Sequence, residues 1–304
     1  MASRVGAKQL LWIDVQGRER ADLDAVGSAV GLDARSLERL ADPPERADLT
    51  LYPDHIHLVL QVTEPPTDDR RPDGAHLVRR PVDIVAGRNW VVTIHDEPLA
   101  ALARFDATTE GETRLGALDA ASFVAAVADE VLADYLELVE DFEREIDRLD
   151  ERALRHGSDT DILGQIVRMR RRIGLIRRTL APHRVAFAAL ARPDMALHEE
   201  LGEPWPGLTD RLDRALEAVE NLRDLLLGTF EIYMGRTAQD ANDTMKVLTL
   251  LSAVLLPGVV LAGVMGMNFK LPFFDAAENF WIVIGAMVAF GVAILGVARW
   301  RGWL

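Results

Sequence analysis

The chain has 304 residues, of which 49% are hydrophobic and 27% charged, and its net charge at pH 7 is −14. An acidic chain is not suited to nucleic acid as a partner, because phosphate backbones are bound by basic surfaces. It contains no cysteine, which excludes disulfide bonds and thiolate metal sites. The first twelve residues lack the apolar core and cleavage site of a secretory signal, so we expect the N-terminus to stay in the cytoplasm.

Residues 1–115 are predicted to form a cytoplasmic α/β domain. Short apolar or β-branched runs bounded by Gly, Pro and Asp predict strands over 8–15, 49–63, 77–85 and 89–95. Between the first two runs, the stretch from Asp22 to Leu40 predicts a helix with capping chemistry at its start. The strand order does not follow from the sequence, so only the class of this domain is predicted.

Residues 116–206 are predicted to form an antiparallel hairpin of two helices. Apolar residues recur every three or four positions on both sides of a turn at 156–158. Residues 119–155 carry 12 acidic and 4 basic side chains, whereas 161–192 carry eight arginines and one aspartate. We expect these opposite charges to neutralise each other, and a specific cation or lipid site between the helices is the less favoured alternative.

A long helix is predicted over 207–269, because no strong helix breaker separates a cytoplasmic stalk from a first membrane span. Lys246 and Lys270 bracket 23 uncharged residues, and Glu278 and Arg299 bracket another 20. A hydrocarbon core about 30 Å thick needs roughly 20 apolar residues as helix, so both segments are long enough to cross a bilayer.

The two spans are predicted to form a tight hairpin. Residues 270–278 are the extracytoplasmic loop, and 279–304 are the second span with a C-terminal tail. The basic residues at the outer ends of the hairpin are Arg236, Lys246, Arg299 and Arg301. Since positive charge favours the cytoplasmic side, we expect both termini there.

The first span carries a polar stripe that a simple membrane anchor does not need. Its side chains fall three or four residues apart, so they share one helix face, which we expect to line a pore in an assembly of several copies. The members of this face are Asn242, Met245, Leu248 with its neighbour Thr249, Ser252, Leu256, Val259 and Gly263. Carboxylates would attract cations to the two mouths, with Asp240 and Asp243 inside and Asp275 and Glu278 outside.

The tripeptide Gly266-Met267-Asn268 ends the polar-striped span. Taken alone it is an ordinary helix C-terminus, because glycine and asparagine both tolerate the left-handed conformation. In a symmetric assembly, however, its position would bring a ring of Asn268 amides to the pore mouth. Amide oxygens suit Mg²⁺, which sheds water reluctantly, so we expect the ring to hold the hydrated ion.

These residues resemble the CorA family of divalent metal cation transporters. The similarity is specific over 220–304 and weaker over the α/β domain. It is carried by Asn242–Thr249, Leu256-Pro257, Ala262-Gly263, Gly266–Phe269 and Arg301–Leu304, and in the α/β domain by Leu11–Val15 and Trp90–His95.

The resemblance implies a funnel-shaped homopentamer in a bacterial inner membrane, with the first span lining the pore. Gly266, Met267 and Asn268 would form the selectivity filter, and Asn242 would lie at the inner end. Met245, Leu248 and Leu256 would be apolar constrictions. The family passes Mg²⁺ down its electrochemical gradient, with Co²⁺ and Ni²⁺ as further candidates, so neither an enzymatic reaction nor a cofactor is expected, and no phosphate-binding glycine-rich loop occurs.

Three departures from the family pattern keep alternatives open, and one is the loop after the signature, where Lys270 lies near the mouth and only Asp275 and Glu278 are acidic. Met265 stands where magnesium-transporting members usually carry tyrosine, and Gly207 stands where some members have an aspartate of a regulatory metal site, with Asp210 the nearest substitute. A ZntB-like zinc transporter, with or without proton coupling, is therefore an alternative. A membrane-anchored sensor without ion flux is a third hypothesis, which the polar stripe disfavours.

Overall fold

The structure is a computed structural model that describes residues 10–64, 77–104, 119–155, 161–192, 205–267 and 277–302. The chain divides into two compact units, Met1–Phe230 and Glu231–Leu304. We refer to them as the cytoplasmic-type unit and the apolar unit, and we describe each by itself.

A five-stranded sheet forms the centre of the cytoplasmic-type unit. Its strands are β1 (Leu11–Gln16), β2 (Asp48–Leu51), β3 (Ile56–Glu64), β4 (Val78–Ala86) and β5 (Trp90–His95). The spatial order is β1-β5-β4-β3-β2, with β1 parallel to β5 and the other pairs antiparallel. The single strand expected over 49–63 is wrong, because the chain turns at Pro53-Asp54, where the Tyr52 N–H donates to the His55 carbonyl at 2.9 Å.

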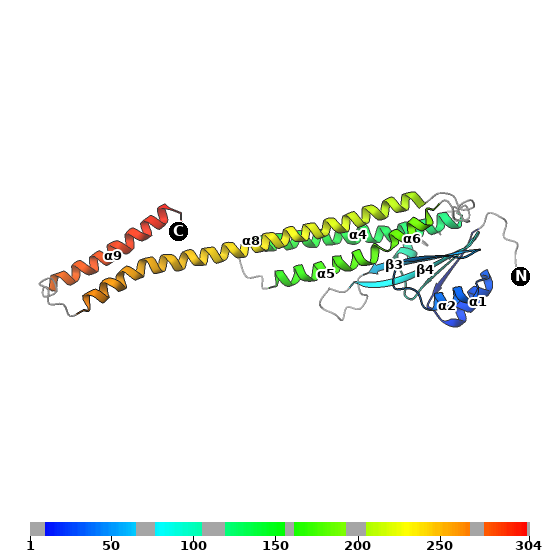
Figure 1. Cartoon of the computed structure of the whole chain (residues 1–304), viewed down its shortest axis with the longest axis horizontal. Helices are drawn as coiled ribbons and strands as arrows, with labels where there is room; N and C mark the ends of the chain where they lie inside the picture. The colour runs from blue at the N-terminus through cyan, green and yellow to red at the C-terminus, as the bar shows by residue number, and fades with distance from the viewer. Residues whose placement is uncertain are drawn as a thin grey trace. The chain divides into compact units, whose positions relative to one another are not determined.

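Two short helices, α1 (Arg20–Val30) and α2 (Ala34–Ala41), cover one face of this sheet (Figure 1). One continuous helix was expected here, but Gly31 adopts a left-handed conformation with φ 83° and ends α1. Asp33 then caps α2 by accepting from the Ser36 N–H at 2.8 Å. The apolar core on this face consists of Val15, Leu23, Leu40, Val85, Val92 and Ile94.

The opposite face of the sheet packs against α4 (Ala120–Leu154), α5 (Ile162–Leu180) and α6 (His183–Leu190) (Figure 1). Trp12 of β1 meets Phe123 of α4 with their ring centroids 5.2 Å apart. The charged helices α4 and α5 pair as expected, since Arg172 donates to Glu145 at 2.8 Å. The excess charge of each helix is thus partly neutralised by the other.

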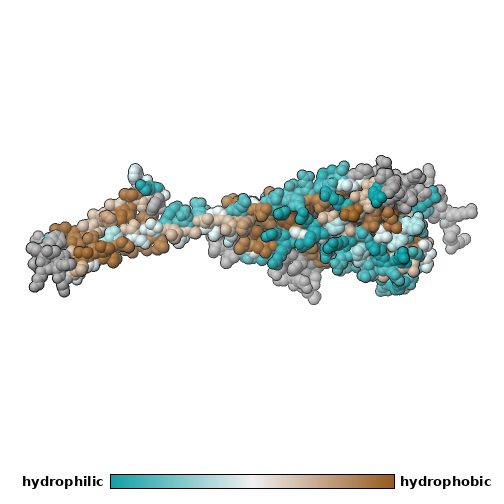
Figure 2. All heavy atoms as spheres, in the orientation of Figure 1, coloured by the Kyte–Doolittle hydropathy of each residue, from teal (hydrophilic) through white to brown (hydrophobic). Residues whose placement is uncertain are grey.

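The helix α8 (Trp205–Met265) is continuous over 61 residues, and α9 (Ala277–Trp300) follows it. Both are long and apolar enough to cross a membrane, and hydrophobic side chains cover α9 and the C-terminal part of α8 (Figure 2). The predicted fold class is therefore confirmed: an α/β unit, long helices and two C-terminal apolar helices.

Candidate functional site

The predicted pore face of α8 is exposed in the apolar unit. The exposed fraction reaches 63% at Leu256 and 69% at Val259. The other exposed members of this face are Asn242, Met245, Leu248, Ser252 and Gly263. A continuous face of exposed apolar side chains is rare in a soluble monomer and usually marks a surface that contacts a protein or a membrane.

A different face of α8 contacts α9. Gly258 lets Met287 approach so closely that a Cβ at this position would lie 3.1 Å from Met287 Cε. Gly291 of α9 is similarly close to Val254, where a Cβ would lie 3.6 Å from Val254 Cγ1. Small residues at such contacts let membrane helices pack closely, because dispersion replaces the hydrophobic driving force.

The two faces of α8 lie on opposite sides of the helix. Val259 follows Leu250 by nine residues, which is about two and a half turns of 3.6 residues, so the two side chains point in opposite directions. Gly263 stands in the same relation to Val254. Leu250 is only 8% exposed, whereas the predicted pore face takes no part in this packing.

Thr249 lies beside the predicted pore face and borders a groove between α8 and α9. Its hydroxyl donates to the Met245 carbonyl at 2.7 Å, so its hydrogen-bonding capacity is used within the helix. Leu248 and Thr249 of the predicted pore face are both exposed, and of these two only Thr249 borders the groove. Further along the span, Pro257 cannot donate a backbone hydrogen bond within α8.

The carboxylates expected at the inner mouth are exposed and paired with cations. Asp240 lies 3.5 Å from Arg236, and Asp243 lies 2.8 Å from Lys246. Exposed pairs of this kind contribute little to stability. Asp210, the candidate regulatory ligand, is exposed on α8, and no cluster of three or more metal-ligating side chains occurs among the described residues.

The predicted selectivity filter is described only in part. Gly266 and Met267 continue the backbone hydrogen bonding at the end of α8, with Gly266 N–H donating to the Ala262 carbonyl at 2.9 Å. Met267 is 54% exposed. Asn268 and Asp275 lie outside the described residues, as does the side chain of Glu278.

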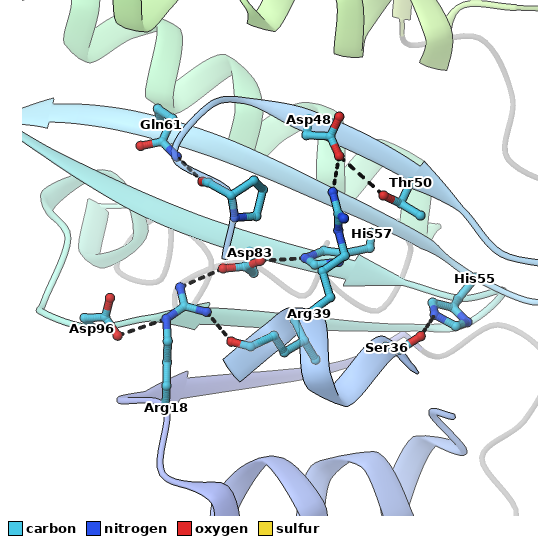
Figure 3. A network of polar contacts seen from close by, with 12 residues as sticks. Arg18, Ser36, Arg39, Asp48, Thr50, His55, His57, Gln61, Asp83 and Asp96 are labelled. Atoms are coloured by element: carbon cyan, nitrogen blue, oxygen red, sulfur yellow. Dashed lines mark hydrogen bonds and ion pairs between the residues drawn. The ribbon is translucent and has the colours of Figure 1, made fainter. Parts of the chain in front are cut away.

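A buried polar network in the cytoplasmic-type unit is a feature that the sequence did not predict (Figure 3). Asp83 of β4 is fully buried and accepts from Arg18 and from His57 Nε2, both at 2.6 Å. Arg18 also donates to the Leu40 carbonyl at 2.6 Å and to Asp96 at 3.0 Å. This network ties β3, β4, α2 and the connection between β1 and α1 together, and its low exposure makes it structural rather than part of an ion path.

Two further histidines in this unit have opposite pKa shifts. The hydrogen bond to Asp14 raises the pKa of His95 despite its partial burial. Burial alone would raise the pKa of Asp14, but hydrogen bonds from His95 and Thr93 lower it. Full burial lowers the pKa of His183 to about 4, so this histidine is neutral and accepts from the Gln61 N–H at 3.1 Å. His57, His95 and His183 are therefore each held by structural hydrogen bonds.

Comparison with known proteins identifies close structural relatives. The family described as CorA-like Mg2+ transporter protein matches residues 7–297. The chain is 24% identical to the cobalt/magnesium transport protein CorA of Thermotoga maritima, over 96% of this chain and 83% of the relative. The complete structure of the CorA magnesium transporter from Methanocaldococcus jannaschii superposes with a TM-score of 0.80 at 18% identity, covering 100% of this chain and 95% of the other. Full-length CmaX gives a TM-score of 0.72 at 22% identity, with coverage of 99% and 91%.

Proposed function

Because this chain belongs to the CorA-like Mg²⁺ transporter family, we propose that it is a channel for hydrated Mg²⁺. The family consists of divalent cation transporters, so the protein is a membrane transporter and not an enzyme, and the cation is its cargo rather than a cofactor. In this proposal Mg²⁺ moves down its electrochemical gradient, and Co²⁺ and Ni²⁺ are further candidate cargoes.

The observation that carries the proposal is the exposed stripe of α8 opposite the face that packs against α9. In a lipid environment Ser252 would be costly if it faced acyl chains. Several copies of α8 around a shared axis would remove this cost by turning the stripe toward water. The family resemblance supports five copies, and the proposed assembly is therefore a homopentamer.

The side chains of the stripe divide the proposed pore into polar and apolar levels. Asn242 and Ser252 would contact the hydration shell of the ion, whereas rings of Met245, Leu248 and Leu256 would form narrow apolar levels. Such rings can stop conduction by excluding water without closing completely. Gating would then require only a small change in the diameter of the pore.

The two mouths of the proposed pore are acidic. Asp240 and Asp243 would form carboxylate rings at the inner mouth, and Asp275 and Glu278 would lie at the outer mouth near the Asn268 ring. The proposed location is the bacterial inner membrane with both termini in the cytoplasm, which the cations Arg236, Lys246, Arg299 and Arg301 support.

A flux assay tests this proposal. The purified full-length protein in liposomes that contain a Mg²⁺ dye should admit Mg²⁺, and Asn268→Ala should abolish entry. Gln239→Ala is the matched control, because this exposed amide on α8 lies outside the stripe. Equal uptake by Asn268→Ala and the control would refute the selectivity role of Asn268. Preferential entry of Zn²⁺ with a pH dependence would instead establish the ZntB-like alternative.

A further inference from the structure

We propose that the helix pair α8–α9 binds one anionic phospholipid, with an acyl chain in the groove between the helices and the phosphate at Arg301. The groove has a volume of about 280 Å³. The groove shares only Thr249 with the predicted pore face, so this inference does not depend on the identity of the transported ion.

The chemistry of the groove is that of a hydrocarbon site. Leu250 and Ala253 of α8 face Ala293 and Val297 of α9 across it. Thr249 also lines the groove, but its hydroxyl is bonded to a backbone carbonyl of its own helix and offers no free donor to a ligand. An alkyl chain therefore fits this lining, whereas a polar ligand would find no partner along it.

A cation marks one end of the groove. Arg301 lines it, and among the described residues its exposed guanidinium has no ion-pair partner. Lys246 lies one helical turn before Leu250, where it pairs with Asp243 at 2.8 Å and adds positive charge on the same flank. A guanidinium binds phosphate through two parallel hydrogen bonds, so the charge at this end complements a phospholipid headgroup.

The length of the groove favours a lipid over a helix of a second copy. From Ala293 to Arg301 there are eight residues, which at about 1.5 Å per residue span about 12 Å. This is less than half of a hydrocarbon core of about 30 Å, so the groove covers a single leaflet. A membrane helix of a neighbouring copy would cross both leaflets. One phospholipid has the matching dimensions: a chain within one leaflet and a phosphate at its surface.

Native mass spectrometry of the full-length protein tests the proposal. Phosphatidylglycerol and phosphatidylcholine with identical oleoyl chains are added in detergent. A charge-assisted hydrogen bond contributes at least about 1.4 kcal/mol, so Arg301→Gln should weaken phosphatidylglycerol binding about tenfold or more. Arg299→Gln is the matched control, because Arg299 is exposed on the same helix end but does not line the groove. An equal effect of the two variants would refute a specific headgroup site.

Groove-filling variants test the acyl chain separately. Ala293→Trp should abolish retention of both lipids, whereas Ala289→Trp, at an exposed position outside the groove, should not. Ala253→Leu fills the same space from α8 and provides a second variant if the first fails to fold. A changed oligomeric mass with unchanged lipid binding would show that a second copy occupies the groove and overturn the proposal. Competition by inorganic phosphate alone, with no effect of groove filling, would overturn it in favour of a free anion site.

Discussion

His183 should make the cytoplasmic-type unit lose stability as the pH falls below neutrality. This fully buried side chain donates from Nδ1 to the Leu180 carbonyl at 3.0 Å and accepts at Nε2 from the Gln61 N–H at 3.1 Å. Gln61 lies on β3 beyond the end of its pairing with β2, so His183 satisfies a backbone group that the sheet leaves unpaired. Protonation of Nε2 would remove this acceptor and place a charge in a buried site.

The magnitude follows from the pKa of His183 in the two states. Its pKa is about 4 in the folded chain and 6.5 when the group is unperturbed, so the unfolded chain binds the proton more readily. The stabilisation is fully present above pH 6.5 and is lost as the pH falls toward 4. Linkage gives a loss of about 2 kcal/mol by pH 5 and about 3 kcal/mol by pH 4. The raised pKa of His95 acts in the opposite direction, since its contribution is present below pH 6.5 and is lost at higher pH.

Hydrogen exchange of the full-length protein at pH 7.5 and pH 5 measures this effect in peptides from β3. His183→Gln is the reference, because its side-chain carbonyl can accept the same hydrogen bond but does not titrate. Comparison at each pH cancels both the intrinsic exchange rate and the contribution of His95. Acidification slows intrinsic exchange in both proteins, and a difference of about 2 kcal/mol predicts that it lowers the protection factors of the β3 amides roughly thirtyfold more in the wild type. An equal change of protection in the two proteins would refute the assignment of neutral His183.

Two other predictions address the pore face and the buried network. The chain has no cysteine, so Leu256→Cys should place several thiols around the proposed axis and make Mg²⁺ flux sensitive to Cd²⁺. Val292→Cys, at an exposed position of α9, should leave the flux insensitive to Cd²⁺. Equal sensitivity of the two variants would contradict the orientation of the stripe. Asp83→Ala should leave the largely buried Arg18 without its main partner and destabilise the protein by about 3 kcal/mol or more. Thermal unfolding should show a much smaller effect for Asp24→Ala, which removes an exposed ion pair, and similar shifts would argue against the network as a stabilising element.

The helices of this protein could be predicted from the sequence because their signals are local. The long helix and the two apolar spans follow from periodicity and length within each segment. The breaks within predicted elements were missed although their signals are present: Gly31 followed by Asp33 is a helix end and a new cap, and Pro53-Asp54 is a turn. In both cases apolar residues continue on either side of the break, so the sequence pattern indicated one continuous element where the structure has two.

The sheet order and the polar network could not be predicted, because their partners are far apart in the chain. Arg18 and Asp83 are separated by 65 residues, and no local pattern connects them. The pore stripe was predictable as a helix face, but its orientation relative to α9 depends on the close contacts at Gly258 and Gly291. The groove that ends at Arg301 likewise exists only after the two helices have packed.

The parallel pairing of β1 with β5 has a consequence for biosynthesis. Ile13 lies opposite Val92, so the ribosome must add 79 residues after Ile13 before its partner residue exists. At about 5–20 residues per second, this delay lasts roughly 4 to 16 s. The nascent N-terminal segment therefore emerges with an unsatisfied strand edge, and the α/β unit completes its sheet only after the fifth strand has left the exit tunnel.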